Sequence, residues 1–465
     1  MTIANRSFRF VWLAAAGVLC VGAAAQADTL ADAFAAAYET NPELIEARAN
    51  LRAVDERVNQ ARAGLRPSLS GRLDYGVDAT SSDRVRESVT DPFQASVTAS
   101  QTLYDGGRTG NATRGRIADV SAARARLVSL EQRVLLDVAR AYADVLRDEE
   151  FVSLARNNVR VIAEQLRASE DRFEVGEVTR TDVSQARARL ASANANLTSV
   201  MGQLERSRQN YRLVVGAEPL NLRPLPPLPA LPLSAEDAVD QALENHPEII
   251  AARFDETSAS RDVRASIGEL LPRVSLDGTV AYGDAAVFRD GGEDTTSASL
   301  TLRATIPLYQ GGAEYSRIRQ AQALASRARA GITTQARARR QVAEAAWTEL
   351  QVARANIRSN REGVDAARLA FEGVREEAIV GSRTTLDVLD AEQELLDART
   401  QLVASIRDEF VAAYGLLSTV GRLTAADVGL AVTAYDPDVN FAENNTRLIG
   451  YPVSEDTVWE ELWRP

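Results

Sequence analysis

Two aspartates, Asp387 and Asp390, are the residues of this sequence whose types and spacing best suit binding chemistry. A long helical pattern stops at Gly381 and another starts just after Thr385, which places both carboxylates early in the second helix. Because they are three residues apart, they share one face of that helix. Copies of this pair, brought together by oligomerisation, would form a ring of carboxylates that favours cations. A simpler role is that Asp387 complements the positive N-terminal end of its own helix.

The rest of the sequence offers few groups for catalysis. Cys20 is the only cysteine and falls in a segment that we expect to be removed, so we expect no thiol nucleophile or cysteine metal ligand. His246 is the only histidine, and before Pro247 it suits a helix start better than a metal site. Gly106–Gly107 and Gly311–Gly312 lack the lysine of a phosphate-binding loop. We therefore predict no catalytic residue, cofactor or metal, and the net charge of -12 argues against a nucleic-acid partner.

The first 27 residues have the order of a secretory signal peptide. Arg6 and Arg9 precede an apolar run from Phe10 to Val21, which is too short to span a bilayer comfortably. Ala25–Ala27 fits a small-x-small cleavage site, so we expect the mature chain to begin at Asp28. No later run approaches 18 apolar residues, so the sequence predicts no membrane helix.

An internal repeat with an offset of about 205 residues organises the rest of the chain. Matches occur in the same order in both copies: Asn41–Glu43 with His246–Glu248, Leu103–Gly107 with Leu308–Gly312, Val175–Gly176 with Val380–Gly381, and Asp182–Val183 with Asp387–Val388. We predict a signal peptide at 1–27, repeat 1 at 28–217, a proline-rich linker at 218–234, repeat 2 at 235–422 and a C-terminal equatorial tail at 423–465. The linker has the composition of a stiff polyproline-type connector outside any core.

Each repeat has the same predicted order: a helix, two strands, a very long helix, a tip turn and a medium helix. The predicted strands are 67–78 and 93–104 in repeat 1 and 272–283 and 297–309 in repeat 2, and the tip turns are 174–181 and 380–385. At 1.5 Å per residue the long helices span roughly 100 Å and the shorter ones roughly 50 Å each. Two shorter helices stacked end to end therefore match one long helix, which favours a cylinder of helices over a compact bundle.

The predicted strands alternate apolar and polar residues, as Val97, Thr98 and Ala99 do. Each is about ten to thirteen residues long, which a tilted strand needs to cross an outer membrane. A soluble sheet with one wet face is the alternative, but its strands are usually nearer five or six residues. About four strands cannot close a barrel, and an open edge in lipid is very costly, so oligomerisation is required.

Three chains are the smallest assembly that leaves a lumen, because two would give about eight strands and a filled interior. The sequence therefore predicts an α+β membrane protein: a trimer whose antiparallel β-barrel of about 12 strands, about 4 from each chain, continues into a long α-helical barrel. The polar loops 78–92 and 284–296 suit the cell exterior. Gly106, Gly107, Gly311 and Gly312 sit at the strand-to-helix elbows and supply backbone freedom there.

The chain resembles the TolC-type family of trimeric outer-membrane efflux proteins. The resemblance rests on Leu-Tyr-x-Gly-Gly after the second strand of each repeat and on the run V-G-S-R-T-T-L-D-V-L-D-A-E-Q-E-L that begins at Val380. It implies a cell outer-membrane protein with a long periplasmic portion. It also implies a passive exit duct for drugs or unfolded proteins in a tripartite efflux or type I secretion system, with an adaptor protein and an inner-membrane pump as partners.

The resemblance also implies roles for residues at the tips. Asp387 and Asp390 match the family's aperture ring, Arg383 and Asp182 match partners in its iris latch, and Val175, Gly176, Val380 and Gly381 match its adaptor-contact tips. Ala378 stands where the best-known member has a latch tyrosine, so we expect a differently wired latch. The alternative function is a periplasmic coiled-coil adaptor or structural protein of an export machine, which would explain the helices but not the strands.

Overall fold

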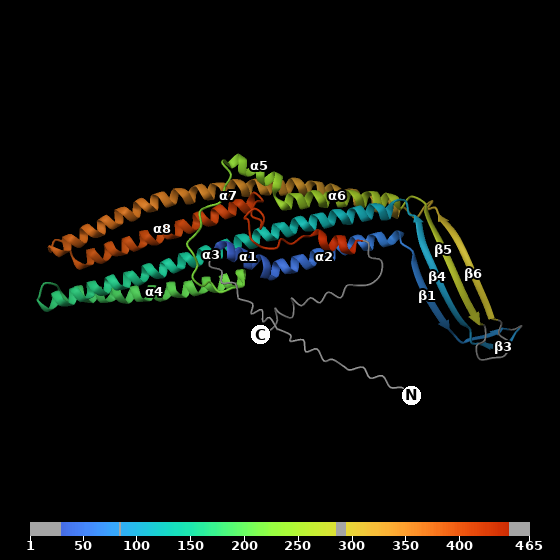
Figure 1. Cartoon of the computed structure of the whole chain (residues 1–465), viewed down its shortest axis with the longest axis horizontal. Helices are drawn as coiled ribbons and strands as arrows, with labels where there is room; N and C mark the ends of the chain where they lie inside the picture. Colours follow the sequence, from blue (N-terminus) through green and yellow to red (C-terminus); the bar gives the residue numbers. More distant parts are fainter. Residues whose placement is uncertain (1–28, 83–84, 285–293, 446–465) are drawn as a thin grey trace, which may run out of the picture.

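The computed structural model describes residues 29–82, 85–284 and 294–445, so the predicted signal peptide lies outside the described residues. Figure 1 shows an elongated layer of helices with a sheet projecting at an angle from one end. The ends of the two longest hairpins lie at the opposite end from the sheet. The molecule therefore has a strand end, a middle and a tip end.

Repeat 1 contains four helices whose breaks follow from the sequence. They are α1 (Leu30–Thr40), α2 (Pro42–Arg62), α3 (Arg108–Glu174) and α4 (Arg180–Val215), with a 3₁₀ turn, η1 (Ala63–Leu65), after α2. Asn41 ends α1 and caps α2, because its side chain accepts the amide of Glu43 and Pro42 has no amide hydrogen to continue α1. The predicted first helix is therefore two helices joined at this position.

Repeat 2 has the same set of helices. They are α5 (Ala235–Asn245), α6 (Pro247–Gly268), α7 (Ala313–Ile379) and α8 (Thr385–Thr419), followed in the tail by α9 (Asp438–Asn444). Helix α3 lies between α2 and α4 on one side and α6 and α8 on the other, and α7 lies beyond α6 and α8 (Figure 1). Each long helix is thus accompanied by two shorter helices placed end to end, as the length argument predicts.

The main hydrophobic core lies at the middle of the layer. It joins α1, α3, α4, α8 and the start of the tail through buried side chains that include Phe34, Tyr142, Tyr211, Phe410 and Leu423. The linker was predicted to stay outside any core, and this is wrong in one respect. Although it is irregular, its leucines, including Leu225, Leu228 and Leu231, pack against this core, because they recur at every third residue, the period of a polyproline-type helix, and so share one side.

Four strands form one antiparallel sheet in the order β1-β4-β5-β6. They are β1 (Ser68–Tyr75), β4 (Phe93–Tyr104), β5 (Arg273–Asp284) and β6 (Asp294–Thr305). The two repeats meet where β4 pairs with β5, with Val97 opposite Val280. This pairing leaves β1 and β6 as the two edges of the sheet.

Three strand predictions differ from the structure. The predicted strand 67–78 ends at Tyr75. The predicted strand 297–309 ends at Thr305, because Pro307 has no amide hydrogen to donate to a neighbouring strand. The predicted polar loop 78–92 contains a second hairpin, β2 (Asp78–Ser82) and β3 (Val85–Thr90), with Asp78 opposite Thr90. Most of the predicted loop 284–296 lies outside the described residues.

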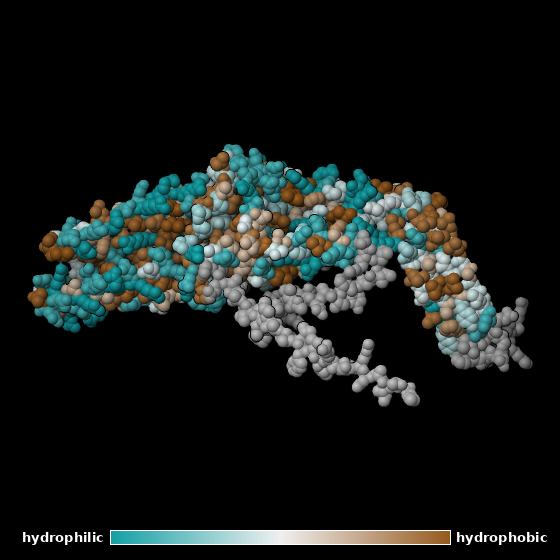
Figure 2. Space-filling model, viewed as in Figure 1, coloured by the Kyte–Doolittle hydropathy of each residue, from teal (hydrophilic) through white to brown (hydrophobic). Residues whose placement is uncertain are grey.

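One face of the sheet is apolar and uncovered. One row across this face runs through all four strands: Leu69 of β1 lies opposite Ala99 of β4, Ala99 lies opposite Gly278 of β5, and Gly278 lies opposite Leu300 of β6. Leu69 and Leu300 are each 75% exposed. Figure 2 shows this hydrophobic surface on the projecting sheet, beyond the reach of the helices. No helix in the described part of the chain combines the length and the hydrophobicity of a membrane-spanning segment.

Candidate functional site

The two helical hairpins, α3–α4 and α7–α8, end in turns of the same construction. Val175 and Val380 are the C-cap residues of α3 and α7, and Gly176 and Gly381 follow with φ of 81° and 82°. The backbone amide of Glu177 donates to the carbonyl of Arg172, and that of Ser382 donates to the carbonyl of Glu377, at 2.9 Å in both hairpins. This is a left-handed glycine cap, which explains why each tip has a valine–glycine pair.

The valines of the two tips are exposed at the end of the molecule. Val175 is 72% exposed and Val380 is 79% exposed. Hydrophobic residues are visible at the tip ends in Figure 2, on hairpins whose other surfaces are largely hydrophilic. An exposed apolar side chain at each tip suits contact with another protein.

The predicted ring residue Asp387 belongs to a capping box at the start of α8. Its carboxylate accepts the backbone amide of Thr384 at 2.9 Å and the Thr384 hydroxyl at 2.8 Å. These hydrogen bonds lower the pKa of Asp387, backbone first, so that it stays ionised at neutral pH. Asp182 makes the same box with Thr179 at the start of α4. The helix-end role considered for Asp387 is therefore present in both repeats.

The second predicted ring residue, Asp390, distinguishes the two repeats. It lies one turn further along α8, where α4 has Gln185. Its carboxylate accepts a hydrogen bond from the guanidinium of Arg189 on α4 at 2.5 Å. Sequence reasoning missed Arg189, because the pair joins residues 201 positions apart and no local spacing indicates such a contact.

The predicted latch residues, Arg383 and Asp182, are not brought together within one chain. The Arg383 guanidinium pairs with Glu377 in its own hairpin at 2.8 Å. Asp182 is held in its capping box by Thr179 at 2.8 Å. Ala378, which we expected to change the wiring of the latch, is buried near the end of α7.

The predicted elbows contain four glycines in the left-handed region. Gly106 and Gly107 have φ of 72° and 75°, and Gly311 and Gly312 have φ of 69° and 82°. A Cβ atom on Gly106 would also lie 2.3 Å from the carbonyl oxygen of Gly268. Nothing lies within 4 Å of the corresponding position on Gly311. The first elbow thus packs tightly on repeat 2, and the second has no such contact within the chain.

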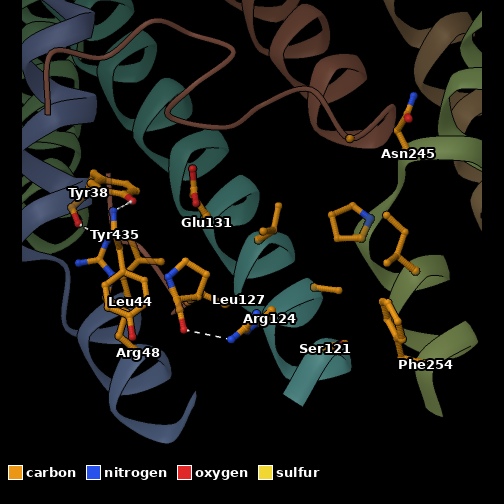
Figure 3. A pocket seen from close by; sticks show the side chains of 16 residues that line it. Tyr38, Leu44, Arg48, Ser121, Arg124, Leu127, Glu131, Asn245, Phe254 and Tyr435 are labelled. Atoms are coloured by element: carbon orange, nitrogen blue, oxygen red, sulfur yellow. Dashed lines mark hydrogen bonds between the residues drawn. The ribbon is translucent and has the colours of Figure 1, made fainter. Parts of the chain in front are cut away.

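A cavity of about 450 Å³ lies at the middle of the molecule, among α2, α3, α6 and the tail (Figure 3). The Arg48 guanidinium lies over the rings of Tyr38 and Tyr435, 4.6 Å and 5.3 Å from their centres. Burial raises the pKa of Glu131, whose carboxylate accepts the amide of Ala425 at 2.7 Å. These contacts attach the tail to the helices. Among the described residues, no cluster of His, Cys, Asp and Glu can hold a metal.

Comparisons with known proteins agree with this architecture. The sequence profile of the outer membrane efflux protein family matches residues 34–217 and 238–416. The outer membrane efflux protein BepC of Brucella suis biovar 1 is 36% identical over 425 residues, which cover 91% of this chain and 92% of BepC. The outer membrane protein TolC of Vibrio cholerae is 27% identical over 424 residues, which cover 89% of this chain and 95% of TolC.

Solved structures show the same fold. The CmeC outer membrane channel of Campylobacter jejuni superposes with a TM-score of 0.75, covering 90% of this chain and 89% of CmeC at 16% identity. The comparisons confirm the predicted resemblance, the fold class, the outer-membrane location and the export function, and they support the exit duct over the periplasmic adaptor. This chain belongs to the outer membrane efflux protein family.

Proposed function

We propose that three copies of this chain form the exit duct of a tripartite efflux or type I secretion system. The duct conducts drugs or unfolded proteins passively from a periplasmic adaptor and an inner-membrane pump to the exterior. The observation that carries this proposal is the open four-stranded sheet with its bare apolar face. Such a surface suits lipid, whereas its two open edges do not, because their backbone groups would lack partners there.

Joining the edge strand β6 of one copy to β1 of the next removes both edges. Three copies then give about twelve strands, which is enough to leave a lumen. The elbows support the same arrangement. Gly106 of repeat 1 packs on Gly268 of repeat 2 in the same chain. By the repeat symmetry, we expect Gly311 of repeat 2 to make the equivalent contact with repeat 1 of the next copy, where nothing lies near it within one chain.

The tips form the periplasmic mouth of this duct in our proposal. Asp387 and Asp390 of each copy contribute to an acidic aperture ring that attracts cations. Arg383 and Asp182 act as latch residues between neighbouring hairpins. In the trimer they make contacts with hairpins of other copies, in addition to the contacts with Glu377 and Thr179 within one chain. Val175, Gly176, Val380 and Gly381 contact the adaptor, for which the exposed valines provide apolar surface.

Fractionation and native mass spectrometry of the detergent-extracted protein test the assembly. We expect a trimer in the outer-membrane fraction, and a soluble periplasmic monomer would contradict the duct.

Planar-bilayer recordings test the mouth, where Asp387→Asn with Asp390→Asn should lower the K⁺/Cl⁻ permeability ratio. Asp240→Asn is the matched control, because Asp240 is an exposed aspartate on α5 at the middle of the molecule. An unchanged ratio in the double variant would count against the ring.

A further inference from the structure

We propose that Arg189 sets the charge of the mouth by neutralising Asp390 while the two hairpins lie together. This inference rests on the proposed function, since it concerns the acids of the aperture ring. In the resting arrangement, Asp387 then supplies the unpaired ring carboxylate of each chain. When α8 moves away from α4, Asp390 loses its partner and the ring gains a second carboxylate per chain.

The position of the Arg189–Asp390 pair supports this role. Among the ion pairs of the described residues, two join the α3–α4 hairpin to α8. Arg407 pairs with Asp144 near the core, and Arg189 pairs with Asp390 near the tips. Whether the tip-side carboxylate has a counter-ion therefore depends on a contact between two separate elements, α4 and α8.

The electrostatics of the pair follow from its geometry. The two charged groups are 2.5 Å apart, much less than the screening length of about 8 Å at physiological salt. An ion on the axis of the mouth therefore experiences a small dipole at Asp390 rather than a full negative charge. Side-chain exposures of 43% for Arg189 and 53% for Asp390 leave both groups within reach of solvent.

The contact between the hairpins is incompletely packed at this level. Leu389 of α8 is buried against Ala186 and Ile162 of the first hairpin. Beside this contact, Arg189 also lines a cavity of about 340 Å³ between α3, α4 and α8. Asn158 lines the same cavity, and its side-chain oxygen has no hydrogen-bond partner within the chain. The cavity leaves fewer packing contacts at this level, so the hairpins can part here more readily than in the core.

The repeat shows that the pair is not a general feature of these helices. Position 394 of α8 corresponds to Arg189 and is Glu394, while Gln185 of α4 corresponds to Asp390. Each repeat therefore contributes one half of the pair. The neighbouring Arg187 pairs instead with Glu170 inside its own hairpin, at 2.9 Å.

Planar-bilayer recordings of the full-length trimer test this inference. Arg189→Ala should raise the K⁺/Cl⁻ permeability ratio about two-fold, because the unpaired carboxylates per chain increase from one to two. Arg189→Lys should keep the wild-type ratio, and Arg189→Ala with Asp390→Asn should restore it. Arg187→Ala is the matched control and should leave the ratio unchanged. In the wild type, open states should favour cations more than resting states, and this difference should disappear in Arg189→Ala.

The outcomes separate this inference from the proposed mouth. An unchanged ratio in Arg189→Ala would overturn the counter-ion role if Asp387→Asn with Asp390→Asn still lowers the ratio. Equal increases in Arg189→Ala and Arg187→Ala would also overturn it, because the effect would then be one of general surface charge. If the double acid variant has no effect either, the aperture ring itself is wrong.

Discussion

Helices α3 and α7 have the same length, 67 residues each, and the same place in their repeats, yet they differ in burial. Helix α3 buries side chains along most of its length, whereas α7 buries only a few. Leu135 is fully buried in α3, and the corresponding residue of α7, Arg340, is exposed. Tyr142 is fully buried, and its counterpart Trp347 is half-buried.

Position in the layer explains the difference. Helix α3 has neighbours on both sides, and α7 lies at the edge of the layer (Figure 1). On its exposed surface α7 carries Val352 and Leu369, which are 52% and 71% exposed, where α3 has Arg147 and Glu164. The edge helix thus presents apolar groups that suit burial by a neighbouring copy.

The strongest test of this comparison places a carboxylate in the central helix. Val138 of α3 is fully buried in the main core, so Val138→Asp would leave a charge there without a partner. We expect a loss of more than about 4 kcal/mol in the free energy of unfolding, enough to prevent folding. Cell fractionation should find no trimer and a degraded chain. A folded trimer of this variant would show that the centre of the layer tolerates charge.

The same change in the edge helix should affect assembly rather than folding. Leu369→Asp introduces a charge on the exposed surface of α7, so we expect the helical content to be retained and the trimer to be lost. Circular dichroism and native mass spectrometry in detergent measure the two properties. Leu369→Met is the matched control and should remain trimeric. A trimeric Leu369→Asp variant would mean that this part of α7 faces solvent in the assembly.

The repeat made most of the fold predictable, because each element could be inferred from two segments. Strand β4 spans the predicted residues 93–104, and the long helices, predicted at about 109–173 and 312–379, differ from these ends by at most one residue. Prediction failed where the local composition was misleading. Pro307 shortens β6, and residues 78–90, whose polar composition resembles that of a loop, contain the β2–β3 hairpin.

The candidate site was less predictable than the fold. The acids Asp387 and Asp390 are visible in the sequence because their spacing is local. Their partners differ in this respect. Thr384 lies three residues from Asp387 and forms a recognisable capping box, whereas Arg189 reaches Asp390 only through the packing of α4 beside α8. Contacts between elements distant in sequence depend on the register of the two hairpins, which no local pattern specifies.

A third test uses the caps of α2 and α6, which correspond in the two repeats. The ring nitrogen of His246 accepts the amide of Glu248 at 3.2 Å, as the Asn41 oxygen accepts that of Glu43 at 2.9 Å. Burial, and then the charge of Arg339, lower the pKa of His246 to about 4. His246→Ala should cost about 1 kcal/mol at neutral pH, because a cap is lost.

The histidine cap of α6 and the asparagine cap of α2 should respond differently to acid. Since the folded pKa of His246 lies below its ordinary value of 6.5, the unfolded chain binds the proton more readily. The stability of the wild type is therefore unaffected by this group above about pH 6.5 and falls, by about 3 kcal/mol at most, as the pH falls towards about 4 and the unfolded chain takes up the proton first. His246→Asn, which copies Asn41, should abolish this part of the pH dependence of the melting temperature while retaining the cap. The same acid slope in wild type and His246→Asn would assign the slope to other groups.

The smallest expected effect concerns Glu392, which is 6% exposed on α8 where α4 has the exposed Arg187. Burial raises the pKa of Glu392, although Arg399 and Arg160 oppose the shift. The ionised form is therefore less stable when buried, and Glu392→Gln should raise stability at pH 7.5 by about 1 kcal/mol. Because the wild-type acid becomes neutral as the pH falls through its raised pKa, this gain should disappear below about pH 4.5. Thermal unfolding at both pH values measures it, with Glu394→Gln on the exposed side of α8 as the control. A loss of stability in Glu392→Gln at pH 7.5 would mean that the two arginines hold the carboxylate as an ion, and that burial in α8 favours the charge.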